Sequence, residues 1–412
     1  MSEKFPTLSL KERDRRWNCI MDLMKSNGVE CLVVPGFKGR EELEGYLSNE
    51  YAQGLVVFPL DGNPVHLTWT GTRITRHMES TLRGVTPWVE DMRVGVNGPA
   101  LVDVLKEKGF EKGRIGVVGL ESRAPGEPEG FFPYKTWAYV LKELPQATFI
   151  ELSDAFAEMI LVKSEEEIAL MRHSAMIGEE ACKKMLEIVE PGVNERDIYL
   201  AIIAVIFKYG ASSPEPFLIL HSGLENLSWG PPMWKYQGGT ARTIKQGDLV
   251  QAEIFPRYGG MESQQQMSVH FKPLNKTIVE LAMVARRSYE IGLAALHAGT
   301  TFQDVCDAME GPVLEERCWH LTPLIHSLSP SGWVSGTGVG IERDSGMGWL
   351  EGKVRSRGVT GGDLLIKPGM VFELEPNACK AKHRVNIGGT VVVTEDGVEE
   401  LNKLPTEMQV IG

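Results

Sequence analysis

Two carboxylates near the C-terminus stand where a strand would present them together. The segment Phe372-Glu-Leu-Glu-Pro376 places Glu373 and Glu375 two residues apart. Because successive side chains of a strand point to opposite faces, a regular strand puts both carboxylates on one face. Crowded like charges raise each other's pKa, which suits general acids and bases or the binding of a cation. We therefore expect Glu375 to be a catalytic group and Glu373 to contact the substrate.

A histidine and a tyrosine are candidate proton carriers. His221 ends the apolar run Leu218-Ile-Leu220, where a strand would deliver it to a site. Tyr236 has a phenol whose ordinary pKa is about 10, so it can donate a proton or a hydrogen bond. A histidine at the end of a strand is also typical of a structural role, so both interpretations of His221 stay open.

The segment Trp229-Gly-Pro-Pro-Met-Trp-Lys-Tyr236 concentrates aromatic side chains. Trp229 and Trp234, if they lie near the carboxylates, can cage a quaternary or guanidinium cation. The alternative is a rigid, proline-rich loop whose aromatic rings pack at a subunit contact. A second glycine-rich segment, Gly336-x-Gly338-x-Gly340, does not open a helix after a strand, so we reject a nucleotide-binding loop there.

Composition excludes several classes of partner. The 412 residues suffice for two domains, and 42% hydrophobic with 24% charged residues is ordinary for a globular protein. A net charge of −12 argues against nucleic acid, which needs a basic surface. No apolar run reaches the ~18 residues of a membrane span, and the N-terminus lacks the core of a signal peptide. The six cysteines are scattered, which favours free thiols in a reducing compartment, so we expect a cytoplasmic protein.

The first part of the chain alternates helices and strands, which predicts an α/β domain. Periodicity predicts a helix over 10–27 that Gly28 ends, and a second helix over 99–108. The predicted strands are 29–35, 55–59, 64–68 and 115–119.

A domain boundary falls before a long helix. Ser164 and Glu167 have the spacing of a capping box and open a helix from 165 to about 190, so we divide the chain into domains 1–160 and 161–412. The second domain contains a repeat. In each copy a glycine ends one helix and a polar residue, Asn194 or Thr301, caps the next. The two copies lie roughly one hundred residues apart and predict a duplicated α/β half.

Three segments in the second domain resemble the pita-bread family of methionine aminopeptidase, Xaa-Pro aminopeptidase, prolidase and creatinase. They are Ser335–Gly340, Pro368–Pro376 and Asn386–Gly397, in the family's order and spacing. The resemblance covers nearly the whole chain. It implies an α/β N-terminal domain of the creatinase and prolidase type, followed by an α+β pita-bread catalytic domain with an internal duplication.

The resemblance also implies that a metal site has been lost. The family's peptidases hold two metal ions on Asp, Asp, His, Glu and Glu. The matching positions here are Glu253, Gln266, Thr337, Glu375 and Gly388. Two carboxylates do not offset the charge of two dications, so we expect no metal and no cofactor. Four nearby residues could serve as replacement metal ligands: Glu262, Glu373, His270 and His383.

Creatinase is the family member that works without metal, and Glu253-Ile-Phe-Pro256 resembles its first ligand strand. The resemblance therefore implies a metal-independent, creatinase-like hydrolase or lyase that acts on a C–N bond of a small cationic or zwitterionic compound. Creatine itself is an unsuitable substrate, because the segment Ser48–Gly54 lacks the arginine that would hold its carboxylate. Two alternatives stay open: a metal-dependent Xaa-Pro dipeptidase or aminopeptidase with shifted ligands, and a non-catalytic binding protein.

The expected roles follow from this reading. Glu253 or Glu375 orients the substrate or water, and His221 or Tyr236 moves the proton. The expected substrate contacts are Trp229, Trp234, Glu262, Gln266, Thr337, Arg343 and Glu373. The family also implies a homodimer, with the segments around Tyr51 and from Trp69 to Arg76 as candidates to reach the partner's site.

Overall fold

The computed structural model describes residues 5–36, 43–50, 53–121, 132–350 and 352–412. These residues divide into two compact units, residues 7–160 and residues 161–412 together with Phe5 and Pro6. Tyr51 lies outside the described residues. Within the described part of the chain, no helix is both long enough and apolar enough to cross a membrane.

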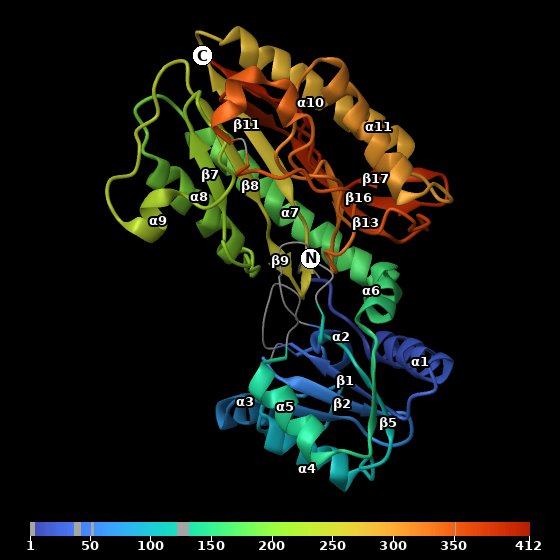
Figure 1. Cartoon of the computed structure of the whole chain (residues 1–412). Helices are drawn as coiled ribbons and strands as arrows, with labels where there is room; N and C mark the ends of the chain where they lie inside the picture. The colour runs from blue at the N-terminus through green and yellow to red at the C-terminus, as the bar shows by residue number, and fades with distance from the viewer. Residues whose placement is uncertain (1–4, 37–42, 51–52, 122–131, 351) are drawn as a thin grey trace. The chain divides into compact units, whose positions relative to one another are not determined.

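The unit of residues 7–160 is a six-stranded sheet in the order β4-β3-β2-β1-β5-β6 (Figure 1). The pairs β1–β2 and β2–β3 are antiparallel, and the other neighbours are parallel. Its strands are β1 (Cys31–Pro35), β2 (Leu55–Pro59), β3 (Val65–Thr68), β4 (Asp91–Val94), β5 (Arg114–Val117) and β6 (Thr148–Glu151). Its helices are α1 (Leu10–Ser26), α2 (Gly45–Ser48), α3 (Gly71–Leu82), α4 (Gly98–Glu107), α5 (Tyr134–Glu143) and α6 (Ser153–Leu161).

Helices cover both faces of this sheet. Val33 of β1 packs with α4 and α5, while its neighbour Leu32 packs with α1 and α6. Strands that are buried on both faces have continuous apolar sequences. Cys31–Pro35 and Leu55–Pro59 are two such strands. The predicted α/β character of this part of the chain is confirmed.

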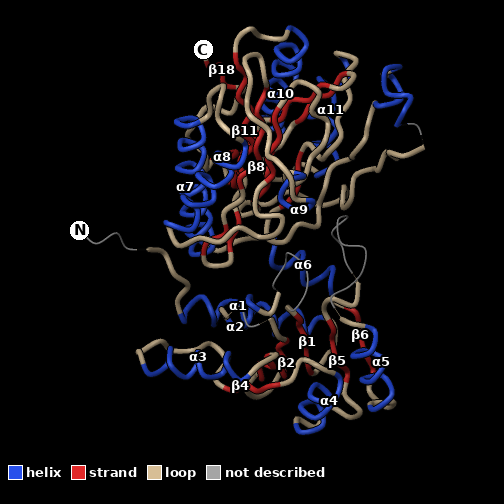
Figure 2. Tube along the Cα trace, turned by 90° about the vertical axis from the view of Figure 1, so that its left-hand side faces the viewer, coloured by secondary structure: helices blue, strands red, loops and turns tan. Residues whose placement is uncertain are grey.

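The unit of residues 161–412 is built on an eight-stranded sheet in the order β12-β13-β16-β11-β8-β7, to which β17 and β18 add (Figure 2). Its strands are β7 (Ile219–Ser222), β8 (Leu249–Ile254), β11 (Gln265–Phe271), β12 (Ile325–Ser327), β13 (Val371–Leu374), β16 (Gly388–Thr394), β17 (Gly397–Glu400) and β18 (Gln409–Ile411). Two short hairpins stand beside it: β9 (Arg257–Tyr258) with β10 (Met261–Glu262), and β14 (Asn377–Lys380) with β15 (His383–Asn386). The helices are α7 (Glu165–Ile188), α8 (Glu195–Lys208), α9 (Met233–Gln237), α10 (Lys276–Ala295), α11 (Phe302–Glu315) and the 3₁₀ turns η1 (Ile341–Arg343) and η2 (Ser345–Leu350).

The predicted repeat is visible in this order. The first half contributes α7, α8 and the strands β7-β8-β11, and the second contributes α10, α11 and β12-β13-β16. The two sets of strands meet where β11 pairs with β16. The capping box of Ser164 and Glu167 opens α7, and Asn194 and Thr301 cap α8 and α11, as the sequence predicts.

Alternation along the strands separates an apolar face from a polar one. On β8, Val250, Ala252 and Ile254 pack with α7 and α8, so Gln251 and Glu253 point to the other face. On β13 the Phe372 ring stacks on Phe302 of α11 at a centroid distance of 5.7 Å, so Glu373 points away from that helix. The helices therefore leave the polar face available for a site.

Candidate active site

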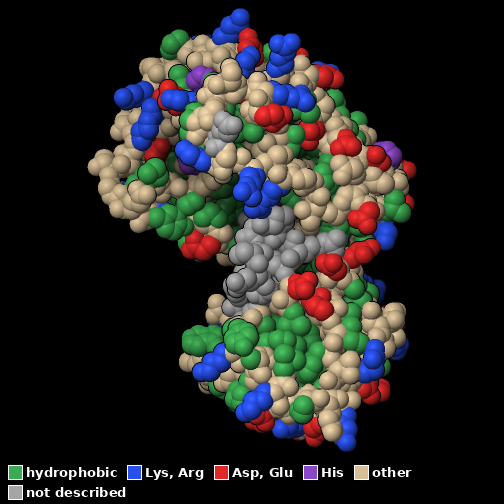
Figure 3. Space-filling model, in the orientation of Figure 1, with side chains coloured by type: hydrophobic (Ala, Val, Ile, Leu, Met, Phe, Trp, Pro, Cys, Tyr) green, Lys and Arg blue, Asp and Glu red, His purple; other side chains and the backbone are tan. Residues whose placement is uncertain are grey.

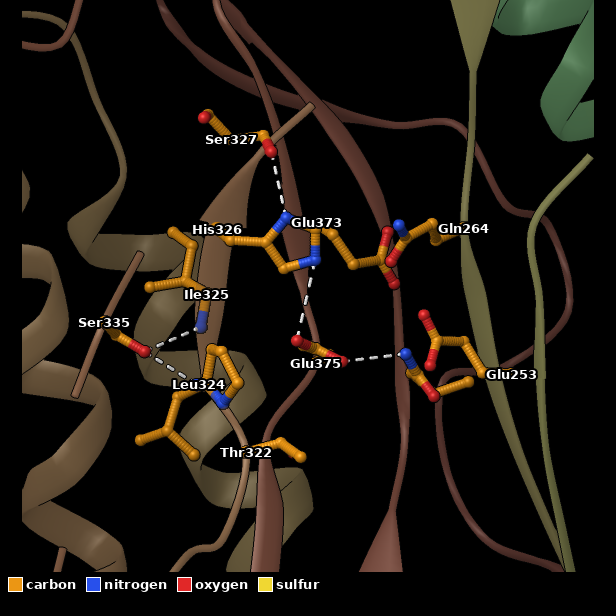
Figure 4. A network of polar contacts seen from close by, with 12 residues as sticks. Glu253, Gln264, Thr322, Leu324, Ile325, His326, Ser327, Ser335, Glu373 and Glu375 are labelled. Carbon is orange, nitrogen blue, oxygen red and sulfur yellow. Dashed lines mark hydrogen bonds and ion pairs between the residues drawn. The ribbon is translucent and has the colours of Figure 1, made fainter. Parts of the chain in front are cut away.

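A row of buried polar side chains crosses the polar face of the eight-stranded sheet. The register places Gln266 of β11 opposite Glu253 of β8, and Glu373 of β13 opposite both Thr390 of β16 and His326 of β12. Directly paired residues of antiparallel strands lie on the same face. Figure 4 shows the carboxylates and His326 converging from these strands. The two halves of the repeat thus contribute to one site.

Glu375 connects the two halves of this row. It follows β13 and is 4% exposed. The Gln266 amide donates through Nε2 to Glu375 Oε2 at 2.9 Å. On the other side, His326 Nε2 lies 3.6 Å from Glu375 Oε1 (Figure 4). The carboxylate is therefore held between an amide from the first half and an imidazole from the second.

The backbone of β12 fixes the tautomer of His326. Its Nδ1 lies 2.9 Å from the carbonyl oxygen of Ser327. Because a carbonyl only accepts, Nδ1 carries the hydrogen and Nε2 presents its lone pair toward Glu375 in the neutral ring. Ser335 Oγ accepts from the backbone N–H groups of Leu324 and Ile325, at 2.7 and 3.2 Å, and so holds the strand that carries the histidine.

Glu373 is the most buried carboxylate of the row. It is 0% exposed, and its Oε2 bonds with Thr390 Oγ1 at 2.9 Å. Burial raises the pKa of Glu373 well above its usual range, and the neighbouring charge of Glu375 adds to this effect. Glu373 therefore lies near Glu375, and its contact with a substrate stays a prediction.

A tryptophan and an arginine close the site beside Glu253. Trp229 Nε1 donates to Glu253 Oε2 at 2.8 Å. The buried Arg384 lies over the Trp229 ring, 4.5 Å from its centroid, and donates to Asn386 Oδ1 at 2.6 Å. Burial lowers the pKa of Arg384, while the charges of Glu375 and Glu253 oppose that shift. Arg384 is thus a positive charge close to two of the carboxylates.

Glu262 belongs to the same acidic cluster. Arg257 donates to its Oε2 at 3.0 Å, and Gln264 Nε2 donates to its Oε1 at 2.8 Å. Gln264 also bonds through its backbone N–H to Thr390 Oγ1, which in turn contacts Glu373. Figure 4 shows the Gln264 amide beside the Glu373 carboxyl group.

Both ring nitrogens of His221 contact the loop that carries Trp229. Its Nε2 accepts from the backbone N–H of Gly230 at 3.2 Å, its Nδ1 lies 3.2 Å from Ser228 Oγ, and its ring stacks near Trp229. Burial, aided by the nearby Arg384, lowers the pKa of His221 to about 4. The neutral imidazole therefore fastens the loop that carries Trp229, and its position favours this role over proton transfer.

Four predicted site residues make contacts that do not join the polar network. Tyr236 is 59% exposed and bonds to Glu215, Trp234 bonds to Glu195, Arg343 pairs with Glu342, and the Thr337 backbone pairs with Arg357. Tyr236 and Trp234 both belong to α9. This helix packs against α8, where the Trp234 ring meets Tyr199 edge-on at a centroid distance of 5.5 Å. Their assignment to the site therefore stays a prediction that these contacts do not support.

Sequence reasoning missed several residues of the network, among them His326, Gln264 and Arg384. One signal could have found the first. His221 pairs with Gln251, and His326 pairs with Glu373, in the strands that correspond in the two halves. The repeated triplets Leu220-His221-Ser222 and Ile325-His326-Ser327 mark these equivalent positions.

Comparisons with known proteins identify the family of this chain. The model of "Metallopeptidase family M24" matches residues 169–395. The ectoine hydrolase of Halomonas elongata is 23% identical, covering 93% of this chain and 94% of its own length. The creatinase of a Bacillus species is 20% identical, covering 97% and 92%.

Solved structures show the same fold. A dipeptidase PepE from Mycobacterium ulcerans has a TM-score of 0.74 at 18% identity, covering 98% of this chain and 99% of that one. A Xaa-Pro dipeptidase from Bacillus anthracis has a TM-score of 0.72 at 17% identity, covering 97% and 100%. The expected pita-bread fold behind an N-terminal domain is confirmed.

The side chains present do not fit a pair of divalent metal ions. Gln266 turns its N–H group, not an oxygen, toward Glu375, and Gln264 two residues earlier has the same neutral amide. A Cβ on Gly388 would lie 2.4 Å from the Leu374 carbonyl oxygen, so a ligand side chain has no room there. Among the described residues, no group of three His, Cys, Asp or Glu side chains is arranged to hold a metal.

The two histidines considered as replacement ligands are bound to backbone groups instead. The Asn275 N–H donates to His270 Nε2 at 2.9 Å, and His383 Nδ1 lies 2.8 Å from the Leu224 carbonyl oxygen. A histidine ligand needs a ring nitrogen that points at the metal with its lone pair available. Both ring nitrogens of His270 are occupied, since its Nδ1 also lies 3.0 Å from the Asp248 carbonyl oxygen. The contact of His383 occupies Nδ1 alone, so it does not exclude Nε2 of that ring as a ligand.

Proposed function

Because the chain belongs to metallopeptidase family M24 and resembles its creatinase- and prolidase-like hydrolases, we propose that it hydrolyses a C–N bond of a small cationic or zwitterionic compound without a catalytic metal. The main support is the cluster of four buried carboxylates, Glu253, Glu373 and Glu375 at the polar face of the sheet and Glu262 on the β9–β10 hairpin. Several buried like charges are costly unless a cation compensates them. Arg257 and Arg384 offset part of this charge, and a positively charged substrate supplies further compensation.

His326 and Glu375 form the acid–base pair in this proposal. Nδ1 of His326 is committed to the Ser327 carbonyl, so Nε2 accepts the proton of the attacking water. The water oxygen bonds to the substrate carbon as this proton leaves, and the C–N bond then breaks. The leaving nitrogen takes the proton back from Nε2. The Glu375 carboxylate, 3.6 Å from Nε2, stabilises the imidazolium between these steps.

A ligand screen followed by a turnover assay tests the proposal. Metal-depleted protein is melted with amines, guanidines, betaines, ectoine, creatine and Xaa-Pro dipeptides, and stabilising compounds are assayed for release of an amine or ammonia. We expect a cationic or zwitterionic compound to be hydrolysed at the same rate with and without a chelator. Hydrolysis that starts only after a divalent metal is added contradicts the proposal and favours a metal-dependent Xaa-Pro peptidase.

We also infer that the chain forms a homodimer. Trp69, Met78 and Leu82, on or beside α3, are 54%, 58% and 86% exposed. Figure 3 shows hydrophobic side chains gathered on the N-terminal unit. Apolar side chains that cluster on a surface favour a protein contact. Light scattering of the protein and of Leu82→Glu is the test, and a monomeric wild type at micromolar concentration argues against a dimer.

A further inference from the structure

Three buried oxygens of the candidate site have no hydrogen-bond donor within the described part of the chain. They are Oε1 of Gln264, Oε1 of Gln266 and Oε1 of Glu373. The side chains belong to residues that are 3%, 3% and 0% exposed. Native structures pair most of their buried acceptors, so three unpaired oxygens in one cluster point to a ligand that brings donors.

Neighbouring groups fix the direction of these oxygens. The N–H groups of Gln264 and Gln266 are drawn to carboxylates, at 2.8 Å to Glu262 and 2.9 Å to Glu375. Rotating either amide by half a turn would set its oxygen against a carboxylate oxygen. The amide oxygens are therefore held away from these carboxylates. On Glu373, the contact with Thr390 occupies Oε2 and leaves Oε1 unpaired.

The three side chains come together through the register of the strands. Thr390 Oγ1 contacts both the backbone of Gln264 and the carboxyl group of Glu373, and Figure 4 shows the ends of those two side chains adjacent. Gln266 lies opposite Gly388, whose missing side chain leaves room for the amide to reach Glu375. The acceptors thus line one part of the site.

Trp229, the tryptophan that contacts Glu253, already has a protein cation over its ring. Arg384 lies 4.5 Å from the centroid of that ring, and Trp234, the other tryptophan of the segment, lies outside the network with Arg196 over its ring at 5.1 Å. A quaternary ammonium ion, which has no N–H group, relies on such ring faces for recognition. A quaternary cation therefore lacks an unoccupied ring face at Trp229. A cation with N–H groups can instead donate to the unpaired acceptor oxygens.

We propose that the site recognises its substrate through a cationic nitrogen group with several N–H bonds, whose donors meet Oε1 of Gln264, Gln266 and Glu373. This inference rests on the proposed function and deepens it. Amidinium, guanidinium and primary ammonium groups share the required chemistry, and quaternary ammonium lacks it. The three side chains then determine specificity. A ligand without donors would leave their buried oxygens unpaired in the complex, and this lowers its binding affinity.

Binding to the metal-depleted full chain tests this proposal without a turnover assay. Calorimetry compares acetamidinium, methylammonium and tetramethylammonium at matched ionic strength. We expect one or both N–H cations to bind at least ~10-fold more tightly than tetramethylammonium. Tighter binding of acetamidinium identifies a planar group, and tighter binding of methylammonium a tetrahedral one. Equal binding of tetramethylammonium, or no binding of either N–H cation, overturns the proposal.

Variants separate recognition from general damage. Gln264→Met and Gln266→Met remove an acceptor at nearly constant size, and each should lower the affinity for the preferred N–H cation by ~10-fold. Gln265→Met is the matched control, since Gln265 lies on the opposite face, where its Oε1 accepts from Cys182. A loss in the control equal to that in the two variants contradicts the assignment. Binding without hydrolysis refutes the proposed function alone, and hydrolysis of a quaternary substrate refutes this inference alone.

Discussion

The two halves of the catalytic domain place a histidine at the same position and give it different surroundings. His221 lies opposite Gln251 in the first half, and His326 lies opposite Glu373 in the second. His221 accepts from Gly230 and holds a loop, whereas His326 turns Nε2 toward Glu375. The repeat thus supplies the frame, and the neighbouring loop decides which histidine meets a carboxylate.

The strands that pair with the two histidines also differ in their polar side chains. The first half has Gln251 and Glu253 where the second has Glu373 and Glu375. Glu253 accepts from Trp229, while Glu375 faces both an amide and an imidazole. Proton transfer is therefore assigned to the second half, and closure of the site to the first.

Substitution of Glu375 should have one of the two largest effects. Glu375→Gln keeps the shape and removes the charge that stabilises His326, so turnover should fall by roughly 10³-fold or more while the fold remains intact. The circular dichroism spectrum and melting temperature are the checks on folding. A fully active Glu375→Gln enzyme would show that the chemistry lies elsewhere.

The two histidines provide the direct comparison between the halves. His326→Gln should lower kcat by ~10³-fold, as much as Glu375→Gln, with little change in melting temperature, because it removes the proton carrier through which Glu375 acts. His221→Gln should lower kcat far less, since its ring only fastens the loop around Trp229. Equal losses of kcat in the two variants would contradict the division of roles.

Gly388 distinguishes the present site from the family's metal site. A Cβ there would lie 2.4 Å from the Leu374 carbonyl oxygen and 2.8 Å from Gln266 Cγ. Gly388→Ala should therefore lower the free energy of unfolding by ~1–3 kcal/mol. Gly311→Ala is the control, because nothing lies within 4 Å of its Cβ. Urea denaturation measures both, and an unchanged Gly388→Ala variant would show that the site has room for the missing ligand.

The low pKa of His221 predicts a pH dependence of stability. Its pKa is about 4 in the fold and near 6.5 in the unfolded chain, so the unfolded state binds more protons between these values. The stabilisation is complete above pH 6.5 and is lost as the pH falls to 4. His221→Gln should reduce the fall in unfolding free energy over this window by roughly 1–3 kcal/mol. The same pH profile in variant and wild type would contradict the buried, neutral ring.

Sequence patterns predicted the elements and part of the site. Periodicity identified α1, α4 and α7 to within a few residues, because amphipathic spacing and caps are local signals. Alternation of side chains along a strand, which is also a local signal, predicted that Glu373 lies near Glu375. The segment from Trp229 to Tyr236 could not be predicted, because its direction depends on packing of Trp234 against Tyr199. Likewise, the contact between Gln266 and Glu375 joins residues that are distant in sequence.

The metal content of the purified protein tests the central claim most directly. The claim is that Glu253, Gln266, Thr337, Glu375 and Gly388 no longer hold two metal ions. Elemental analysis after dialysis, at known protein concentration, should find well under one equivalent of transition metal per chain, because three of these five positions lack the family's ligand side chain. Two equivalents of tightly bound metal per chain would contradict the account.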